Sequence, residues 1–259
     1  MALAALEAGK HVWVEKPLAL TAAHGRELVA TAKRHGTTLF VDETFLYDPL
    51  VVEMRQRIEA GELGDIYHLS FERLGMGRIR RDSDVWWNSA PHDLSILFYL
   101  VPRDPKRVQL HLHSYLQPDL ADQAVADLEL DGGVSAHVYL SWLHPQKVAS
   151  VFVIGSQRML QYEGRFEKRA LTLHDYTVDL SPLPIGRGAG AIPIVPISNQ
   201  RATEIAAPAG VEPLREAAAH FVDCVRSGTE PRSSGAKSLR VVEALDMAVR
   251  GATRGGFHA

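Results

Sequence analysis

Residues 1–44 alternate between helical and strand patterns, and this alternation constrains the fold more than any other feature of the chain. The segment "MALAALEAGK" has the pattern of a helix that Gly9 ends, and "HVWVE" follows as a short buried strand. Thr21 can cap a second helix, "TAAHGRELVATAKRHG", which Gly36 ends before a second strand, "TTLFVDET". Helices and strands joined in this order by short connections are typical of a parallel α/β sheet.

Polar residues stand where both predicted strands end. Glu15, Lys16 and Pro17 follow the first strand directly, and Thr44 follows the second. Because right-handed crossovers bring the carboxyl ends of parallel strands to one edge, we expect these residues to lie along that edge. Ligands bind at that edge in open α/β sheets. Without further motifs, Glu15 and Lys16 would be interpreted as an ordinary exposed pair.

After Tyr47 the pattern changes to one dominated by alternating strands. Asp48-Pro49 opens a helix, a strand follows, and a loop carrying Trp86 and Trp87 leads to a short apolar helix with Pro91 in its first turn. The further predicted strands are "RVQLHLHS", the hairpin "AVADLELDGGVSAHVYLSW", "KVASVFVIG", "RMLQYEG" and "ALTLHDYTVDL". Such strands predict a mostly antiparallel sheet with one covered face.

The last part of the chain is predicted to be a loop followed by two helices. Residues 181–200 are rich in proline and glycine, and they predict a long irregular loop. Within them, "GRGAGA" at 186–191 matches the dinucleotide fingerprint G-x-G-x-x-G/A. Flanking prolines exclude the strand and helix that this motif requires, so we assign no cofactor binding there. Helices are predicted at about residues 212–227 and 237–253.

Composition excludes several classes of protein. The 259 residues are 46% hydrophobic and carry a net charge of -3, which gives no indication of nucleic acid or membrane binding. The single cysteine, Cys224, excludes an internal disulfide and favours a reducing, cytoplasmic location. Cys224 lies in a predicted helix, where we expect a buried, inert thiol. We predict no metal site.

Five segments, in order along the chain, resemble the glucose–fructose oxidoreductase / inositol dehydrogenase / MocA (Gfo/Idh/MocA) family. They are "GKHVWVEKPLA", "VDETFLYDP", "NSAPHDLSIL", "SWLHPQKV…VIGSQRMLQYE" and "EPLREAAAHFVDCVRSGTEP". The fourth resembles the sugar-nucleotide branch of the family. The resemblance implies an α/β chain that begins as the truncated C-terminal remnant of a Rossmann domain (1–46). An α+β substrate and oligomerisation domain with a large, mostly antiparallel sheet (47–259) would follow.

The resemblance also implies a reaction and the residues that carry it. Family members bind NAD or NADP and oxidise or reduce a sugar, sugar nucleotide or cyclitol at one carbon. Lys16 matches the lysine between nicotinamide and substrate, and His92 matches an acid/base histidine. Pro17 matches a proline whose peptide bond is often cis. The implied cofactor contacts are Glu15, Lys16, Pro17 and Thr44; the implied substrate contacts are Lys16, Asn88 and His92.

The residue types suit this chemistry, because hydride transfer from a carbinol carbon requires loss of the hydroxyl proton. A lysine at a partly buried sheet edge has a lowered pKa, and a histidine titrates near neutral pH. Either side chain can be the base.

Several assignments stay open at this stage. His92 could instead cap a helix, and Trp86 and Trp87 could pack in the core or form sugar platforms. His144 and Lys147 are either substrate contacts or polar residues of a hairpin rim. An alternative function is a catalytically inactive remnant that serves as a binding or assembly module.

The sequence departs from the family pattern in two respects. Asn88 stands where the family usually has Asp, and Asp42 and Glu43 replace Gly and His. An amide cannot act as a base. The family's first strand and its G-x-G-x-x-G turn precede the segment that matches Ala2–Gly9, so we expect the pyrophosphate and adenosine sites to be missing from these 259 residues.

We therefore predict that the 259-residue chain by itself binds NAD(H) and NADP(H) weakly or not at all. The physical reason is the lack of a glycine turn at a helix N-terminus, which holds the pyrophosphate in the family. Calorimetric titration with each dinucleotide measures this directly. An affinity in the micromolar range would contradict the prediction.

Overall fold

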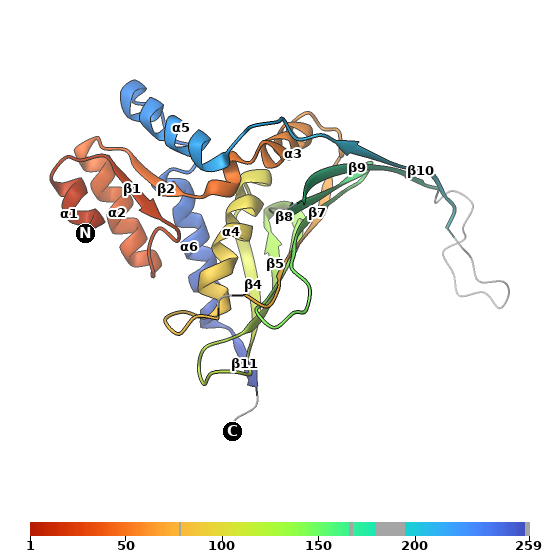
Figure 1. The fold of residues 1–259 in the computed structure, drawn as a ribbon, viewed down its shortest axis with the longest axis horizontal. Coiled ribbons are helices and arrows are strands. Elements are labelled where there is room, and N and C mark those ends of the chain that lie inside the picture. The colour runs from red at the N-terminus through yellow and green to blue at the C-terminus, as the bar shows by residue number, and fades with distance from the viewer. Residues whose placement is uncertain (78, 166–167, 180–194, 257–259) are drawn as a thin grey trace.

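The computed structural model describes residues 1–77, 79–165, 168–179 and 195–256. A small parallel sheet with its helices lies at one end of the molecule, and a large sheet lies at the other (Figure 1). The α-helices are α1 (Ala2–Glu7), α2 (Ala22–His35), α3 (Pro49–Glu59), α4 (Val85–Leu100), α5 (Pro213–Ser227) and α6 (Gly235–Arg250). Two short 3₁₀ helices are η1 (Thr44–Tyr47) and η2 (Asp131–Gly133).

The small sheet has the parallel pairing that the sequence predicts. Strands β1 (Val12–Glu15) and β2 (Leu39–Asp42) pair from Val12–Leu39 to Glu15–Asp42. Helix α2 connects them, with the Thr21 hydroxyl accepting from the backbone N–H of His24 at 3.2 Å. Both strand ends therefore lie at one edge of the sheet, as predicted.

The large sheet has nine strands in the order β10-β9-β8-β7-β3-β6-β5-β4-β11. Two of its pairings, β3–β6 and β4–β11, are parallel and the others are antiparallel. The predicted mostly antiparallel sheet is confirmed. Its strands are β3 (Ile66–Leu74), β4 (Pro105–Ser114), β5 (Gln123–Leu130), β6 (Ser135–Ser141), β7 (Val148–Gly155), β8 (Arg158–Arg165), β9 (Lys168–Val178), β10 (Ile197–Ile205) and β11 (Thr253–Gly256).

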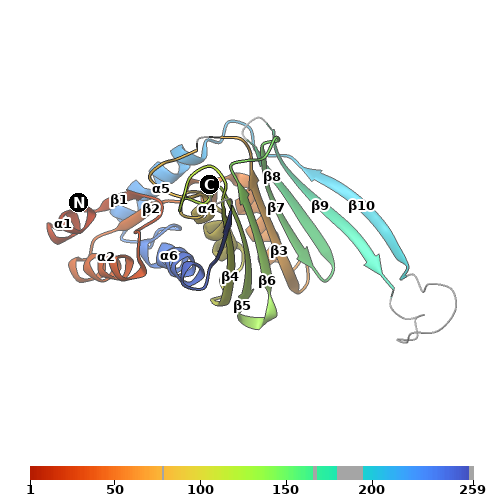
Figure 2. The same ribbon diagram turned by 90° about the horizontal axis from the view of Figure 1, so that it is seen from below.

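Helices cover one face of this sheet (Figure 2). Side chains of alternating sheet residues, such as Ala126, Val138 and Leu140, are fully buried in one hydrophobic core with Leu94 and Leu245 of α4 and α6. This burial removes a large apolar area from water, at about 25 cal/mol per Å². The core fixes the position of α4, which carries the predicted histidine.

Helix α6 links the two parts of the molecule. Val242 belongs to the core of the small sheet, whereas Val241 belongs to the core of the large sheet. The Asp246 carboxylate accepts from the backbone N–H of Ala22 at 2.8 Å, at the start of α2. The predicted domain boundary between residues 46 and 47 falls within η1. Helix α6 packs against α2, which precedes this boundary, and against α4, which follows it.

Three sequence-based assignments are corrected. Helix α4 begins at Val85, so Trp86 and Trp87 are helical rather than in a loop, because the Asp84 carboxylate accepts from the Trp87 N–H at 2.9 Å. Residues from Ile197 onward form β10 rather than loop, because they pair with β9. A terminal strand, β11, follows α6 and pairs with β4. The segment 186–191 lies outside the described residues.

Among the described residues, no helix combines the length and the apolar character needed to cross a membrane.

We propose that the uncovered face of the large sheet forms a homodimer interface. The alternation of β6 by itself leaves open whether Val138 and Leu140 or their neighbours lie on this face; in the structure both are fully buried in the core on the covered side. The outer face carries Phe152, Ile154 and Met159, which are half-buried and border a groove of about 830 Å³. An apolar groove of this size on a sheet is typical of an interaction surface.

The expected result is that Ile154→Glu converts a two-fold dimer into a monomer, because a charge in the centre of the contact would lose its hydration. Light scattering at micromolar concentration measures the mass. The matched control is Val222→Glu on the exposed part of α5, which should leave the mass unchanged. A wild-type chain that is already monomeric would contradict this proposal.

Candidate active site

Lys16 extends from the end of β1 toward α4. Its ammonium group donates to the backbone oxygen of Asn88 at 2.7 Å, and the Lys16–Pro17 peptide bond is cis. Asn88 lies in the first part of α4, so this contact joins the end of the parallel sheet to the helix of the second part. The structure thus brings together two of the residues that the sequence singles out.

His92 follows Asn88 by one helical turn and lies on the same side of α4. Its ring meets that of Phe45 edge to face, with centroids 5.2 Å apart and an interplanar angle of 78°. His92 is half-buried and lies within the helix, so it does not cap one. Lys16, Phe45 and His92 therefore come from β1, η1 and α4 to one place.

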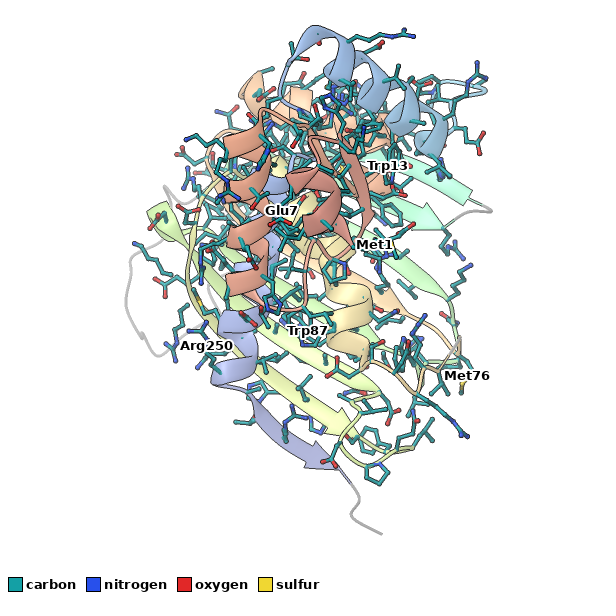
Figure 3. The ribbon with its side chains drawn as sticks, turned by 90° about the vertical axis from the view of Figure 1, so that its left-hand side faces the viewer. Met1, Glu7, Trp13, Met76, Trp87 and Arg250 are labelled. Atoms are coloured by element: carbon teal, nitrogen blue, oxygen red, sulfur yellow. The ribbon has the colours of Figure 1, made fainter. Side chains whose placement is uncertain are left out.

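The two tryptophans before this site differ in their surroundings. Trp86 is fully buried in the main core, so it packs in the core and does not form a sugar platform. Trp87 is half-buried, packs against the same core, and lies on the side of the molecule that also carries Trp13 (Figure 3).

A buried ion pair that the sequence did not reveal lies beside His92. Asp93 is only 2% exposed, and its two carboxylate oxygens accept from Arg73 of β3 at 2.7 and 3.1 Å. The Arg73 guanidinium also lies over the Phe45 ring, 4.8 Å from its centroid. Arg73 therefore fixes Phe45 and, through it, the ring of His92.

Burial and this arginine lower the pKa of both candidate bases. Partial burial lowers the pKa of Lys16, and the positive charge of Arg73 lowers it further, against the opposing effect of Glu15. Burial lowers the pKa of His92 well below its ordinary value, and the charges of Arg73 and Lys16 act in the same direction. His92 is therefore neutral at physiological pH and can accept a proton.

A cavity of about 390 Å³ adjoins Phe45 and Arg73. It is also lined by Thr44, Asp48, Lys147, Ala149, Gly164, Arg165, Arg169, Glu212, Pro213 and Leu214. The Thr44 hydroxyl donates to the Asp42 carboxylate at 2.7 Å. Lys147 thus borders the cavity, whereas the His144 ring bonds locally with the backbone of Gln146. A volume of this size accommodates a small ligand.

The other two residues predicted to contact the cofactor, Glu15 and Pro17, lie at the end of β1 and just after it. Glu15 is exposed and pairs in register with Asp42, and Pro17 is half-buried. The described residues contain no group of three or more His, Cys, Asp or Glu side chains that could hold a metal ion. Cys224 is 1% exposed, as expected, with its sulfur 3.3 Å from His220 Nε2.

Two family models match the chain in succession. The model described as "Oxidoreductase family, NAD-binding Rossmann fold" matches residues 1–43, and that of the "GFO/IDH/MocA C-terminal domain" matches residues 51–161. Together they cover more than half of the chain. This chain belongs to the Gfo/Idh/MocA family of oxidoreductases.

A curated relative and two solved structures are similar to this Gfo/Idh/MocA chain. It is 29% identical over 156 residues to a scyllo-inositol 2-dehydrogenase (NAD(+)) of Bacillus subtilis, a match that covers 56% of this chain and 45% of the relative. The chain thus spans less than half of the length of the curated relatives that it matches first.

The two structures show the same fold. One is a UDP-N-acetylglucosamine 3-dehydrogenase from Acidithiobacillus ferrooxidans, with a TM-score of 0.79 and 19% identity over 97% of this chain and 73% of the other. The second is an inositol dehydrogenase homologue from Azotobacter vinelandii, complexed with NADH and myo-inositol. Its TM-score is 0.74 and its identity 19%, over 96% of this chain and 71% of the other.

Two residues implied as cofactor contacts, Lys16 and Thr44, follow the two parallel strands of this Gfo/Idh/MocA chain. At the carboxyl ends of β1 and β2, where ligands bind in parallel sheets, Lys16 offers ammonium donors, and the Thr44 hydroxyl, which donates to Asp42, can accept a hydrogen bond. These side chains are polar and partly accessible, so an amide-bearing ring could be held between them and α4.

Sequence reasoning missed Phe45, Arg73 and Asp93. One signal was present, because an aspartate directly after His92 inside the apolar run "PHDLSILFYL" requires a buried cation as its partner. Nothing in the sequence could identify that cation as Arg73, since the two residues lie on different elements.

Removing the charge of Arg73 should raise the pKa of Lys16 and of His92. We use Arg73→Gln with Asp93→Asn, because the single change would leave a buried carboxylate without a partner. Arg73 is the larger influence on Lys16, so the pKa of Lys16 rises in the double variant despite the loss of Asp93, and that of His92 rises as well.

Titration by NMR of the Lys16 ε-carbon and the His92 ring measures both values. Arg26→Gln is the control, because Arg26 pairs with Glu243 on the surface of α2 and α6 and carries the same charge. Unchanged titration curves in a folded double variant would show that Arg73 does not control these groups.

Proposed function

We propose that this chain forms the substrate side of an NAD(P)-dependent oxidoreductase that acts on a hydroxyl or ketone of a sugar, sugar nucleotide or cyclitol. The observation that carries the proposal is that Lys16 bonds α4 one turn before His92, whose ring contacts Phe45 on the wall of a cavity, with the pKa of Lys16 and of His92 lowered. The named relatives, which include inositol and sugar-nucleotide dehydrogenases, support the substrate class.

In the oxidative direction, the reacting hydroxyl would lie between Lys16 and His92. A neutral base accepts the hydroxyl proton while the bound nicotinamide supplies the hydride acceptor. His92 suits the role of base because burial and two nearby cations keep its imidazole neutral. Lys16 can then donate a hydrogen bond to the substrate oxygen in place of the bond that it gives to Asn88.

In the reductive direction the same groups act in reverse. A protonated Lys16 or His92 gives its proton to the ketone oxygen as negative charge develops there. Arg73 keeps the site electropositive, which stabilises that developing charge. Asn88, in place of the family's Asp, offers an amide for hydrogen bonds to neighbouring hydroxyls but no charge.

The experiment that tests the function uses a polypeptide that joins these 259 residues to a complete glycine-turn segment of the family. Reduction of NAD or NADP is followed with myo-inositol, with free aldoses and with a UDP-sugar as separate substrates. Cofactor-dependent turnover of one of these classes is expected. If none reacts in either direction although the dinucleotide binds, the proposed function is wrong.

In that enzyme, Lys16→Ala and His92→Ala should each lower kcat by about 10²-fold or more, because each removes a group that moves or holds the substrate proton. The thermal midpoint should change little for Lys16→Ala, since the lysine contributes one hydrogen bond at the surface of α4. Lys10→Ala, which removes an exposed lysine near β1, is the matched control. Near-normal turnover in both variants would show that other residues carry the reaction.

A further inference from the structure

A second recess, on the other side of η1, shares no lining residue with the cavity of the candidate active site. We call it the α6 recess; its volume is about 300 Å³. It is lined by Glu43, Leu46, Arg55, Glu59, Ser95, Phe98, Tyr99, Pro102, Arg232, Lys237, Arg240 and Val241. Residues three apart share a face of a 3₁₀ helix, so Glu43 and Leu46 face this recess whereas Phe45 and Asp48 face the other.

The α6 recess is rich in positive charge. Four of its lining side chains are cationic: Arg55, Arg232, Lys237 and Arg240. Arg55 bonds Glu59 and the backbone oxygens of Tyr99 and Leu100. Arg240 pairs with Asp104 at 2.7 Å. Arg55 and Arg240 are therefore each already paired with a carboxylate.

Arg232 has a different environment. Its guanidinium lies over the rings of Tyr47 and Tyr99, at 4.8 and 5.8 Å from their centroids, and donates to the backbone oxygen of Leu46 at 2.7 Å. Within the described residues it forms no ion pair. A guanidinium has five N–H donors in a fixed fork, so this rigidly held group keeps donors for a further acceptor.

Lys237 is the second available cation. It lies in the first turn of α6, is about half exposed, and donates to the backbone oxygen of Pro231 at 3.1 Å. The nearest carboxylate, that of Glu230, is 4.0 Å away and exposed, so the pair is weak. Its flexible stem lets the ammonium group turn toward a ligand in the recess.

Glu43 does not cancel this charge at neutral pH. Its carboxyl is 5% exposed, and burial raises its pKa to about 8, helped by the neighbouring charge of Asp42 and opposed by the Ser238 hydroxyl. The protonated carboxyl is a hydrogen-bond donor. Glu59, which is already paired with Arg55, is then the anionic side chain of the lining.

We propose that the α6 recess binds a small organic anion. Its carboxylate or phosphate group contacts Arg232 and Lys237, and its apolar part packs on Phe98, Tyr99 and Pro102. Charge-assisted hydrogen bonds from a planar guanidinium are the strongest that a side chain gives to either group. The volume of the recess suits a ligand of about ten non-hydrogen atoms, at the lower end of small-molecule sites.

The test uses the 259-residue chain and three probes: benzoate, phenyl phosphate and inorganic phosphate. Saturable binding of benzoate or phenyl phosphate, measured by calorimetry and by NMR of arginine Nε–H groups, is expected. The probe that binds more tightly shows whether the recess prefers a carboxylate or a phosphate group. Inorganic phosphate should bind more weakly than phenyl phosphate, because it cannot contact the aromatic wall.

Arg232→Gln and Lys237→Gln should each weaken binding by about tenfold, the effect of one charge-assisted contact. Arg26→Gln, on the surface outside the recess, should have no effect. If Arg232→Gln does not fold because it loses the Leu46 contact, Lys237→Gln decides, since its side chain is exposed.

Affinity for benzoate should fall as pH rises from about 6.5 to about 9, through the Glu43 pKa of about 8, because ionised Glu43 adds a negative charge. The groups that face Glu43 across the recess are Arg55, Glu59, Arg232, Lys237 and Arg240. Glu43→Gln should abolish this fall. Absence of saturable binding below about 10 mM, or binding that neither Arg232→Gln nor Lys237→Gln weakens, would overturn the proposal.

Discussion

The arrangement of the candidate active site depends on one buried carboxylate. Asp93 lies inside an apolar helix and is 2% exposed, so it is stable as an anion only with a cation at hydrogen-bond distance. Arg73 supplies that cation through two bonds from the neighbouring sheet. Removing one partner of such a pair costs about 3–5 kcal/mol, so the pair holds α4 and β3 in a fixed relation.

The same arginine connects structure to chemistry. Its guanidinium lies over Phe45, whose ring contacts His92, and its charge lowers the pKa of both His92 and Lys16. Arg73, which is needed for the packing of α4 on the sheet, therefore also makes Lys16 and His92 lose a proton more readily than they would in water. The positive potential that results would favour an oxyanion at the reacting carbon.

The two faces of η1 border two different recesses, and each recess contains charged side chains. The active-site face presents Phe45 and Asp48, and the opposite face presents Glu43 and Leu46 toward Arg232. A short 3₁₀ helix thus separates two polar recesses with different lining residues. Its position is fixed by Tyr47, which is buried and bonds His220 of α5 and Ser233 before α6.

Local patterns of the sequence determined the elements and one part of the site. Helix caps at Thr21 and Asp48, the apolar strand runs and the Asp131-Gly132-Gly133 turn act over a few residues, so they could be recognised without tertiary information. Lys16 and His92 could be singled out because they stand in segments that resemble those of the family, Lys16 directly after β1 and His92 within α4. Tertiary packing decided the rest. Strand β10 has exposed, polar residues with no clear alternation, and only pairing with β9 makes it a strand. Arg73 of β3 meets Asp93 of the next element, α4, only because that helix packs on the sheet. Arg232 reaches the α6 recess from a part of the chain 186 residues beyond its partner Leu46. Such contacts depend on how the faces of a sheet and its helices fit together, and the spacing of residues along one chain does not encode that fit locally.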